Sequence, residues 1–198
     1  MTISSRLALC LLFAQPAFAQ GLLPGQKPAA PAPTPAPGYL LIGNQVPESL
    51  TVTHETGLKR TLLSYKPAPD ILVVGFFSAD CPENQKLWSA LSRIYHDYYG
   101  WHATFLAVSS KAGETREAVA EAMKKAKMDY TVVRDEDGQA AKLLHATVAP
   151  EIVVIDEWGY VRYRGGIKNI RDIFNSVIGH EPLNQEAEPK DVEGCPIP

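Results

Sequence analysis

The sequence predicts an α/β fold in which helices flank a central mixed sheet. Two continuous apolar runs, at residues 71–77 and 103–108, have the length and composition of strands that are buried on both faces. Between them, apolar residues recur at helical spacing from Leu87 to Tyr98, and the pattern ends at Gly100. A strand, a crossover helix and a second strand of these lengths form a parallel pair.

The alternation of helix and strand patterns continues along the rest of the chain. Further helices are expected at residues 114–126, 139–144 and 170–178, and further strands at residues 131–133, 152–155 and 160–164. A turn-rich tetrapeptide joins the last two strands, so they should form an antiparallel hairpin. An earlier hairpin is expected at residues 50–53 and 60–64.

The sequence also predicts the positions of polar residues in the last helix and the last strand. Asn169, with Asp172 three residues later, is expected to cap the last helix. Tyr160, Arg162 and Arg164 alternate along a strand, so we expect them on its solvated side.

Composition and charge exclude several classes of protein. Of the 198 residues 45% are hydrophobic and 21% are charged, which excludes bulk disorder and a polytopic membrane protein. The formal net charge is −3 and the charges are dispersed, so the chain has no basic surface for nucleic acid. We therefore expect no nucleic-acid partner.

The N-terminus has the pattern of a secretory signal peptide over residues 1–19. Arg6 precedes the apolar run 7–14, which is followed by the small residues Ala17 and Ala19 that flank a cleavage site. The run is far shorter than the roughly 20 residues that cross a bilayer, so no permanent transmembrane anchor is expected. The predicted localisation is therefore exported, either periplasmic or extracellular. Lipidation at Cys10 is disfavoured, because Leu9 is larger than the small residue that precedes lipidated cysteines.

Composition divides the rest of the chain into three parts. Residues 20–38 form a Pro/Ala-rich linker without a core of its own, expected to be a semi-rigid spacer. Residues 39–179 carry the folded domain, and residues 180–198 form a polar tail with Cys195 near its end. Once the signal peptide is removed, Cys81 and Cys195 are the only two thiols.

The most informative segment for chemistry is residues 75–82, which end in Cys81-Pro82. Cys81 follows a buried strand and precedes a helix, where free amide groups and the helix dipole stabilise the nucleophilic thiolate. Pro82 suits the first helical position, since its missing N–H would be unpaired there. The alternative is a buried, inert cysteine at the start of a helix.

This order of elements resembles the thioredoxin-like superfamily over residues 45–179. Cys-Pro at a helix start is followed by Val148-Ala149-Pro150-Glu151, the strand 152–155 and a hairpin. Within this region, residues 146–166 most resemble bacterial redoxin-domain proteins of the alkyl hydroperoxide reductase/thiol-specific antioxidant group. The resemblance implies that Cys81 is the attacking thiol and that Pro150 is a cis-proline facing it, and an X-Pro bond is where a cis peptide costs least.

Departures from the resemblance narrow the mechanism. Thioredoxin-like reductants carry Cys-x-x-Cys, but Asn84 occupies the second cysteine position, so no local disulfide can form. The buried acid of thioredoxins corresponds to Gly75, which removes that proton acceptor. Asp80 and Glu83 flank the thiol instead, and their charges oppose a thiolate.

The pattern of peroxiredoxins is matched less well. Val74 stands where they have proline, and Ser78 stands where they have threonine. Ser78 could still donate a hydrogen bond to a peroxide, but Ala149-Pro150 lacks the arginine that peroxiredoxins show there. Peroxidase activity is therefore the weaker interpretation.

Cys195 supplies a second thiol in a tail that resembles the Gly-Cys-x-Ile endings of the same redoxin proteins. The 16 residues from Gly179 to Cys195 would span about 22 Å if flexible, enough to reach across the domain. Cys195 could resolve a mixed disulfide or sulfenic acid formed at Cys81. It could also form a static disulfide with Cys81, or both thiols could stay unpaired.

We expect no metal and no cofactor. The five histidines lack metal-ligand spacing, and the sequence has no Cys-x-x-Cys-His haem motif, no glycine-rich phosphate loop and no Gly-x-Ser-x-Gly elbow.

The sequence thus favours an exported thiol-disulfide oxidoreductase with Cys81 as nucleophile and Cys195 as resolving thiol. Its partners would be a protein or small-molecule thiol or disulfide and an external dithiol reductant. The expected substrate-binding residues around Cys81 are Ser78, Pro82, Asn84, Ala149 and Pro150. The alternatives are a thiol-dependent peroxidase and a non-catalytic thioredoxin-like binding module with a structural Cys81–Cys195 disulfide.

Overall fold

The computed structural model describes residues 38–98, 100–183 and 192–197. The expected signal peptide, all but the last residue of the expected linker and part of the tail lie outside this range. Within it, no helix has both the length and the apolar character needed to cross a membrane.

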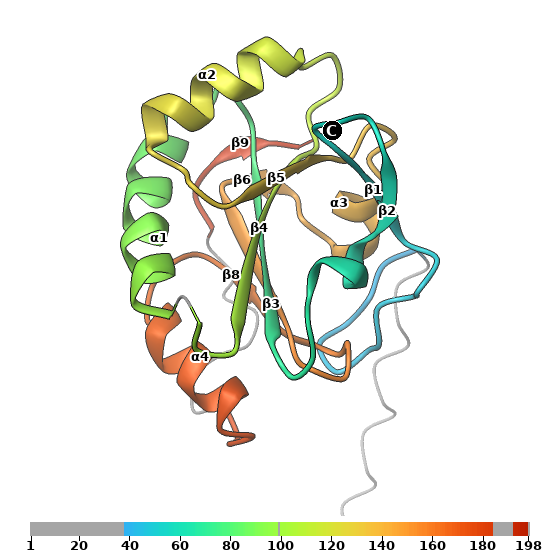
Figure 1. Ribbon diagram of the computed structural model, residues 1–198, viewed down its shortest axis with the longest axis vertical. Coiled ribbons are helices and arrows are strands. Elements are labelled where there is room, and N and C mark those ends of the chain that lie inside the picture. Colours follow the sequence, from blue (N-terminus) through green and yellow to red (C-terminus); the bar gives the residue numbers. More distant parts are fainter. Residues whose placement is uncertain (1–37, 99, 184–191, 198) are drawn as a thin grey trace, which may run out of the picture. The chain divides into compact units, whose positions relative to one another are not determined.

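A seven-stranded mixed sheet forms the centre of the domain (Figure 1). In spatial order its strands are β2 (Lys59–Thr61), β1 (Thr51–His54), β5 (Thr131–Arg134), β4 (Ala103–Ser109), β3 (Ile71–Phe77), β7 (Glu151–Ile155) and β8 (Val161–Gly165). The three central strands β5, β4 and β3 are parallel, and the outer strands on both sides run antiparallel. The mixed α/β sheet, its parallel unit and both hairpins are therefore confirmed. The second strand of the early hairpin, expected at residues 60–64, is shorter than expected, because residues 62–65 form a 3-10 helix.

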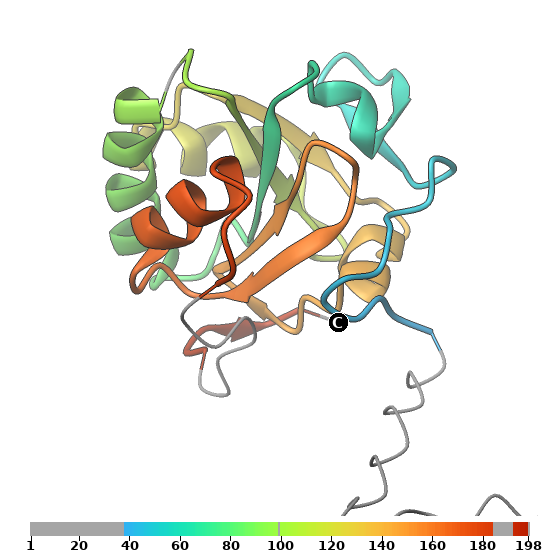
Figure 2. The ribbon, with the colours of Figure 1, turned by 90° about the horizontal axis from the view of Figure 1, so that it is seen from below.

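Helices cover both faces of the sheet (Figure 2). They are α1 (Asn84–Tyr98), α2 (Arg116–Ala126), α3 (Gln139–Leu144) and α4 (Ile170–Ile178), with a short 3-10 helix, η1, at Leu62–Tyr65. Alternate residues of β3 face α1, α2 and α4, and the others face α3 and η1. Every residue of β3 is buried, so this strand lies at the centre of two hydrophobic layers and fixes the start of the loop that follows it.

The contact between β3 and α1 depends on a glycine. A Cβ built on Gly75 would lie 2.4 Å from Cη2 of Trp88, so only glycine leaves room for the indole. Trp88 is 1% exposed and meets Phe77 edge to face. The Trp88 ring thus fills the space that a side chain at position 75 would take, and this contact packs α1 against β3.

Three local expectations need correction. Arg164 is only 4% exposed, because its guanidinium donates to the carbonyl oxygens of Leu144 and Leu40, each at 2.7 Å. Asn169 is the N-cap residue of α4, but its side chain makes no capping hydrogen bond. Helix α1 begins at Asn84, so Pro82 lies in the preceding turn and not at the first helical position.

A second, very small sheet lies beside the Cys81 loop. It pairs β6 (Val148–Ala149) with β9 (Cys195–Pro196) in antiparallel orientation. These two strands bring the end of the chain to the segment that precedes Pro150.

Candidate active site

Cys81 lies in the tight loop that joins β3 to α1. Its backbone N–H donates to the carbonyl oxygen of Ser78 at 3.2 Å, and the N–H of Asn84 donates to the carbonyl oxygen of Cys81 at 3.2 Å. The side-chain amide of Asn84 also donates to the carbonyl of Ser78. These bonds hold Cys81, which is 5% exposed, just ahead of the first turn of α1. Unpaired amide groups at a helix N-terminus stabilise a nearby anion, here a thiolate.

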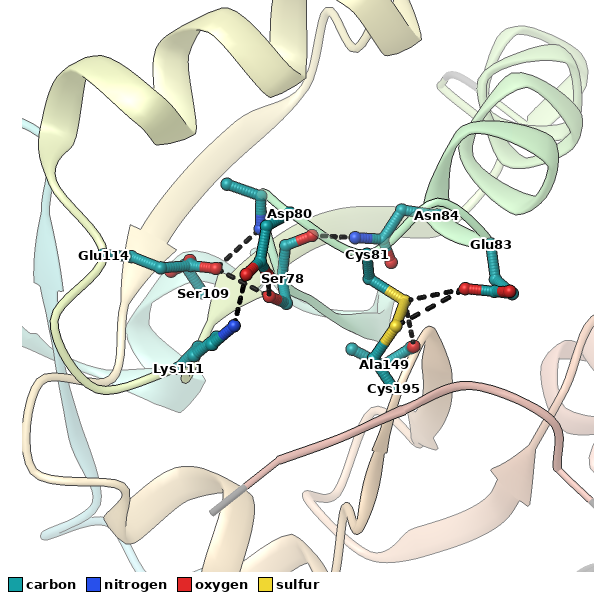
Figure 3. A network of polar contacts seen from close by, with 11 residues as sticks. Ser78, Asp80, Cys81, Glu83, Asn84, Ser109, Lys111, Glu114, Ala149 and Cys195 are labelled. Carbon is teal, nitrogen blue, oxygen red and sulfur yellow. Dashed lines mark hydrogen bonds and ion pairs between the residues drawn. A yellow bond between two sulfur atoms is a disulfide. The ribbon is translucent and has the colours of Figure 1, made fainter.

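Cys81 and Cys195 form a disulfide between residues 114 positions apart in the sequence (Figure 3). Cys195 is partly exposed, in contrast to Cys81. Ala149 is its partner in the strand pair, and the N–H of Ile197 donates to the carbonyl of Thr147 at 3.0 Å. The sequence did not determine whether these two cysteines are paired, and in the structure they are bonded to each other.

The Ala149–Pro150 segment also reaches Cys81. The peptide bond between these residues is cis, and both residues are buried. The carbonyl oxygen of Ala149 lies 3.1 Å from Sγ of Cys81. Of the expected site residues, Cys81, Cys195, Asn84, Ala149 and Pro150 are therefore brought to one place, and Pro82 is exposed beside them.

Glu83 contacts both sulfur atoms. Its Oε2 lies 3.2 Å from Sγ of Cys81 and 3.4 Å from Sγ of Cys195 (Figure 3). The two sulfur atoms and a carboxylate oxygen of Glu83 lie within 4.8 Å of one another, close enough to hold a metal ion. Metal ions bind cysteine as the thiolate, however, and both sulfur atoms are here bonded in a disulfide. The sequence placed Glu83 near the thiol, and the structure adds that its carboxylate lies beside the whole disulfide.

Ser78 is buried, and its hydroxyl is engaged on the side of the loop away from the disulfide. It lies 2.6 Å from Oδ1 of Asp80 and 2.7 Å from Oε1 of Glu114. A hydroxyl has one proton to donate, and here two carboxylates compete for it. The arrangement leaves no free donor on Ser78 for a ligand at Cys81.

Glu114 is a site residue that sequence reasoning missed. It follows β4 and accepts hydrogen bonds from the N–H of Ala79 at 2.6 Å and from the hydroxyls of Ser78 and Ser109. Its carboxylate thereby ties the Cys81 loop to the end of the neighbouring strand (Figure 3). Its only sequence signal was its place just after a strand that neighbours β3.

Asp80 points to a lysine and not to the disulfide. Its carboxylate pairs with Lys111. The hydrogen bond from Lys111, followed by that from Ser78, lowers the pKa of the Asp80 carboxyl from its usual value. Of the two acids that flank Cys81, only Glu83 thus acts directly on the sulfur atoms.

A pocket of about 160 Å³ opens beside Cys81, between the loop and helix α2. Its lining includes the apolar side chains of Phe77, Trp88, Ala126 and Met128 and two side chains of opposite charge, Asp80 and Lys125. Neither Cys195 nor any arginine is among its lining residues, so it approaches Cys81 from a side other than the disulfide partner.

Comparison with known families agrees with this geometry. Residues 42–164, more than half of the chain, match the model of the AhpC/TSA family. The chain belongs to the AhpC/TSA family. The matched range contains β1 to β7, the Cys81 loop and most of β8, whereas Cys195 lies beyond it. Among curated proteins, none matches the sequence significantly.

Solved structures similar to this AhpC/TSA chain share its fold. A hypothetical protein from Sinorhizobium meliloti is 22% identical with a TM-score of 0.70, over 80% of this chain and 94% of that one. The thioredoxin domain of a thiol-disulfide oxidoreductase from Bacteroides vulgatus is 19% identical with a TM-score of 0.57, over 69% and 99%. A thiol-disulfide oxidoreductase from Bacteroides fragilis is 19% identical with a TM-score of 0.57, over 66% and 99%. The expected thioredoxin-like fold is confirmed.

Proposed function

We propose that this chain is an exported thiol-disulfide oxidoreductase whose redox pair is Cys81 and Cys195. One observation carries the proposal. Cys81, at the N-terminal end of α1, is bonded to a partly exposed cysteine on a strand of only two residues. A static clasp needs neither an exposed sulfur nor a sulfur at a helix N-terminus, whereas an exchanging pair benefits from both.

The disulfide offers its more exposed sulfur to a reductant. A donor thiolate attacks Sγ of Cys195, the Cys81–Cys195 bond breaks, and Cys81 leaves as a thiolate. The amide groups at the start of α1 stabilise this leaving group, and a more stable thiolate leaves faster. The second thiolate of the donor then attacks the donor's first sulfur in this mixed disulfide and releases Cys195 as a thiolate. Two electrons have then passed from the donor to the protein.

The reduced pair passes these electrons to a substrate. The Cys81 thiolate attacks a substrate disulfide and forms a mixed disulfide, and one substrate sulfur leaves as a thiolate. Cys195 then attacks Sγ of Cys81, which releases the second substrate sulfur and restores the Cys81–Cys195 bond. The partners are a disulfide-bearing protein or small molecule and an external dithiol.

Glu83 supports these steps as a proton carrier. Its Oε2 lies within 3.4 Å of both sulfur atoms, so it can accept a thiol proton from either cysteine as that cysteine becomes a nucleophile. The same negative charge disfavours the Cys81 thiolate and so limits its reactivity in the absence of a partner.

The chemistry around Cys81 supports disulfide exchange better than peroxide reduction. The Ser78 hydroxyl is held between two carboxylates, and the pocket beside Cys81 is lined by a lysine but by no arginine. A peroxide would therefore meet no free hydroxyl or guanidinium donor among the described residues of that pocket.

Export is the second part of the proposal. The predicted signal peptide at residues 1–19 would direct the chain to an oxidising compartment, where a Cys81–Cys195 disulfide persists. Sequencing the N-terminus of the protein recovered from an envelope or secreted fraction tests this, with a start at Gln20 as the expected result.

The exchange activity is tested with single-cysteine variants of the chain from Gln20 onward. Cys195→Ser, reduced and mixed with an oxidised dithiol peptide, should accumulate a mixed disulfide at Cys81 that mass mapping detects. Cys81→Ser is the matched control, and its exposed thiol should accumulate far less adduct. Consumption of hydrogen peroxide by the wild-type chain without transfer to disulfides would overturn the proposal in favour of a peroxidase.

A further inference from the structure

Gly194, which precedes Cys195, is packed against the backbone of β6. A Cβ built on Gly194 would lie 2.5 Å from the carbonyl oxygen of Ala149, 2.9 Å from its carbonyl carbon and 3.2 Å from Cβ of Val148. The first two are backbone atoms of a buried residue, so they cannot move aside as the end of a flexible side chain can. A side chain at position 194 therefore forces β9 away from β6.

The other contacts of this segment involve mostly its backbone. Cys195 and Pro196 pair with Ala149 and Val148, and the N–H of Ile197 donates to the carbonyl of Thr147. The Ile197 side chain packs on the hydrophobic cluster that includes α3. Backbone pairing accepts many sequences, so the two sequence-dependent features of the docked segment are a glycine before the cysteine and an apolar residue two positions after it.

We infer that Gly194 is a specificity-determining residue for exchange at Cys81. The edge of β6 accepts a cysteine-bearing extended segment when glycine precedes the cysteine, and it disfavours one with any larger residue there. The chain's own tail satisfies this rule, and a partner segment of the form Gly-Cys-x-apolar can replace it when the Cys81–Cys195 bond is open. The inference rests on the proposed function for the exchange chemistry only.

The exchange with such a partner balances as a simple displacement. The Cys81 thiolate attacks the partner's cysteine sulfur within a disulfide, a Cys81–partner bond forms, and the other sulfur of that disulfide leaves as a thiolate. No further oxidant or reductant is needed. The partner's glycine then occupies the place of Gly194 beside Ala149.

A peptide pair tests the selectivity directly. Reduced Cys195→Ser is incubated with blocked Gly-Cys-Pro-Ile or Ala-Cys-Pro-Ile, each supplied as its mixed disulfide with glutathione. Intact mass then gives the ratio of Cys81–peptide to Cys81–glutathione adducts. The tail of this variant competes equally with both peptides, so it does not affect the comparison. Because a Cβ at this position would overlap backbone atoms of Ala149, the glycine peptide should give a ratio about ten-fold higher.

The possible results separate the two proposals. Equal ratios for the two peptides would overturn the role of Gly194 while leaving exchange at Cys81 intact. Absence of every adduct, glutathione included, would overturn the proposed function and this inference with it.

A variant of the intact pair gives an independent measurement. In Gly194→Ala, the equilibrium constant for forming the Cys81–Cys195 disulfide in a glutathione buffer should fall about ten-fold. Glu193→Ala, which changes an exposed neighbour, is the matched control and should change the constant less than about two-fold. An unchanged constant in Gly194→Ala would overturn the inference.

Discussion

The two cysteines of this chain are held in very different ways. The Cys81 loop continues from the fully buried strand β3 and is tied down by hydrogen bonds from Asn84 and to Glu114. Cys195 lies on a two-residue strand that is held by one small strand pair and by the disulfide itself. One sulfur is thus positioned by the core of the domain, and the other by a short surface-docked tail segment together with its bond to the first.

The two cysteines therefore have different roles in the proposed exchange. A sulfur fixed at the end of β3 keeps its place in both redox states, as a nucleophile must. A sulfur on a two-residue strand at the surface can leave and return as the disulfide opens and closes. Variants on the two sides should therefore affect different quantities.

The largest effect is expected from removing the disulfide. Cys195→Ser should unfold cooperatively and lose about 2 to 4 kcal/mol relative to the oxidised wild-type chain, since the bond no longer restricts the unfolded state. Urea unfolding followed by circular dichroism measures this loss. The fully reduced wild-type chain is the control and should match the variant. A variant that no longer folds would contradict the view that the core positions Cys81 without help from the tail.

A smaller loss of stability is expected on the side of Cys81. Glu114→Ala leaves the N–H of Ala79 and the hydroxyl of Ser109 without the Glu114 carboxylate as acceptor, while the Ser78 hydroxyl keeps Asp80, and the loss should cost about 1 to 3 kcal/mol. Glu117→Ala, an exposed acid in the first turn of α2, is the control and should change stability by less than about 0.5 kcal/mol. Equal effects of the two variants in urea unfolding would show that Glu114 does not hold the loop.

The next effect concerns reactivity and not stability. Glu83→Gln removes the negative charge that lies 3.2 Å from Sγ of Cys81, so it should lower the pKa of the Cys81 thiol in the reduced chain. The pH dependence of Cys81 alkylation in a Cys195→Ser background measures this shift. Glu48→Gln, at an exposed site, serves as the matched change and should leave the profile where it was. A pKa that rises in Glu83→Gln would contradict the assigned role of this carboxylate.

The smallest effect is expected at the ion pair on the outer side of the loop. Lys111 lowers the pKa of Asp80 in the folded state, so this contribution to stability is present above the unfolded pKa and is lost as the pH falls through the folded pKa. Lys111→Met should raise the pKa of Asp80 toward its ordinary value, as followed by NMR titration. Because the pair is exposed, the stability at neutral pH should change little. An Asp80 pKa that stays low would mean that Ser78 alone sets it.

The sequence was sufficient to predict the elements that depend on periodic patterns. The apolar runs at 71–77 and 103–108 became neighbouring parallel strands, and the spacing of apolar residues gave α1 its buried face. Arg164 was misplaced, because alternation along a strand cannot indicate that buried carbonyl groups elsewhere in the chain accept its hydrogen bonds.

The sequence predicted only those site residues that belong to short motifs of adjacent residues. Cys81-Pro82 and Ala149-Pro150 are local motifs, and both reach the site. Glu114 joins the loop across 35 residues of sequence, and the fit of Gly194 depends on the register between β9 and β6. Glu114 leaves no periodic or local signal, and the Gly-Cys-x-Ile ending does not indicate what Gly194 packs against, because these contacts join segments that only the fold brings together.

The reduction potential of Cys81–Cys195 shows whether the two cysteines form an exchanging redox pair. The wild-type chain from Gln20 onward is equilibrated in glutathione and dithiothreitol buffers, and the free thiols are trapped and counted by mass. We expect rapid equilibration at a potential above about −300 mV, with electrons passing on to an added disulfide peptide. A bond that resists dithiols and equilibrates below about −300 mV would instead be a structural clasp, and Cys81–Cys195 would not be a redox pair.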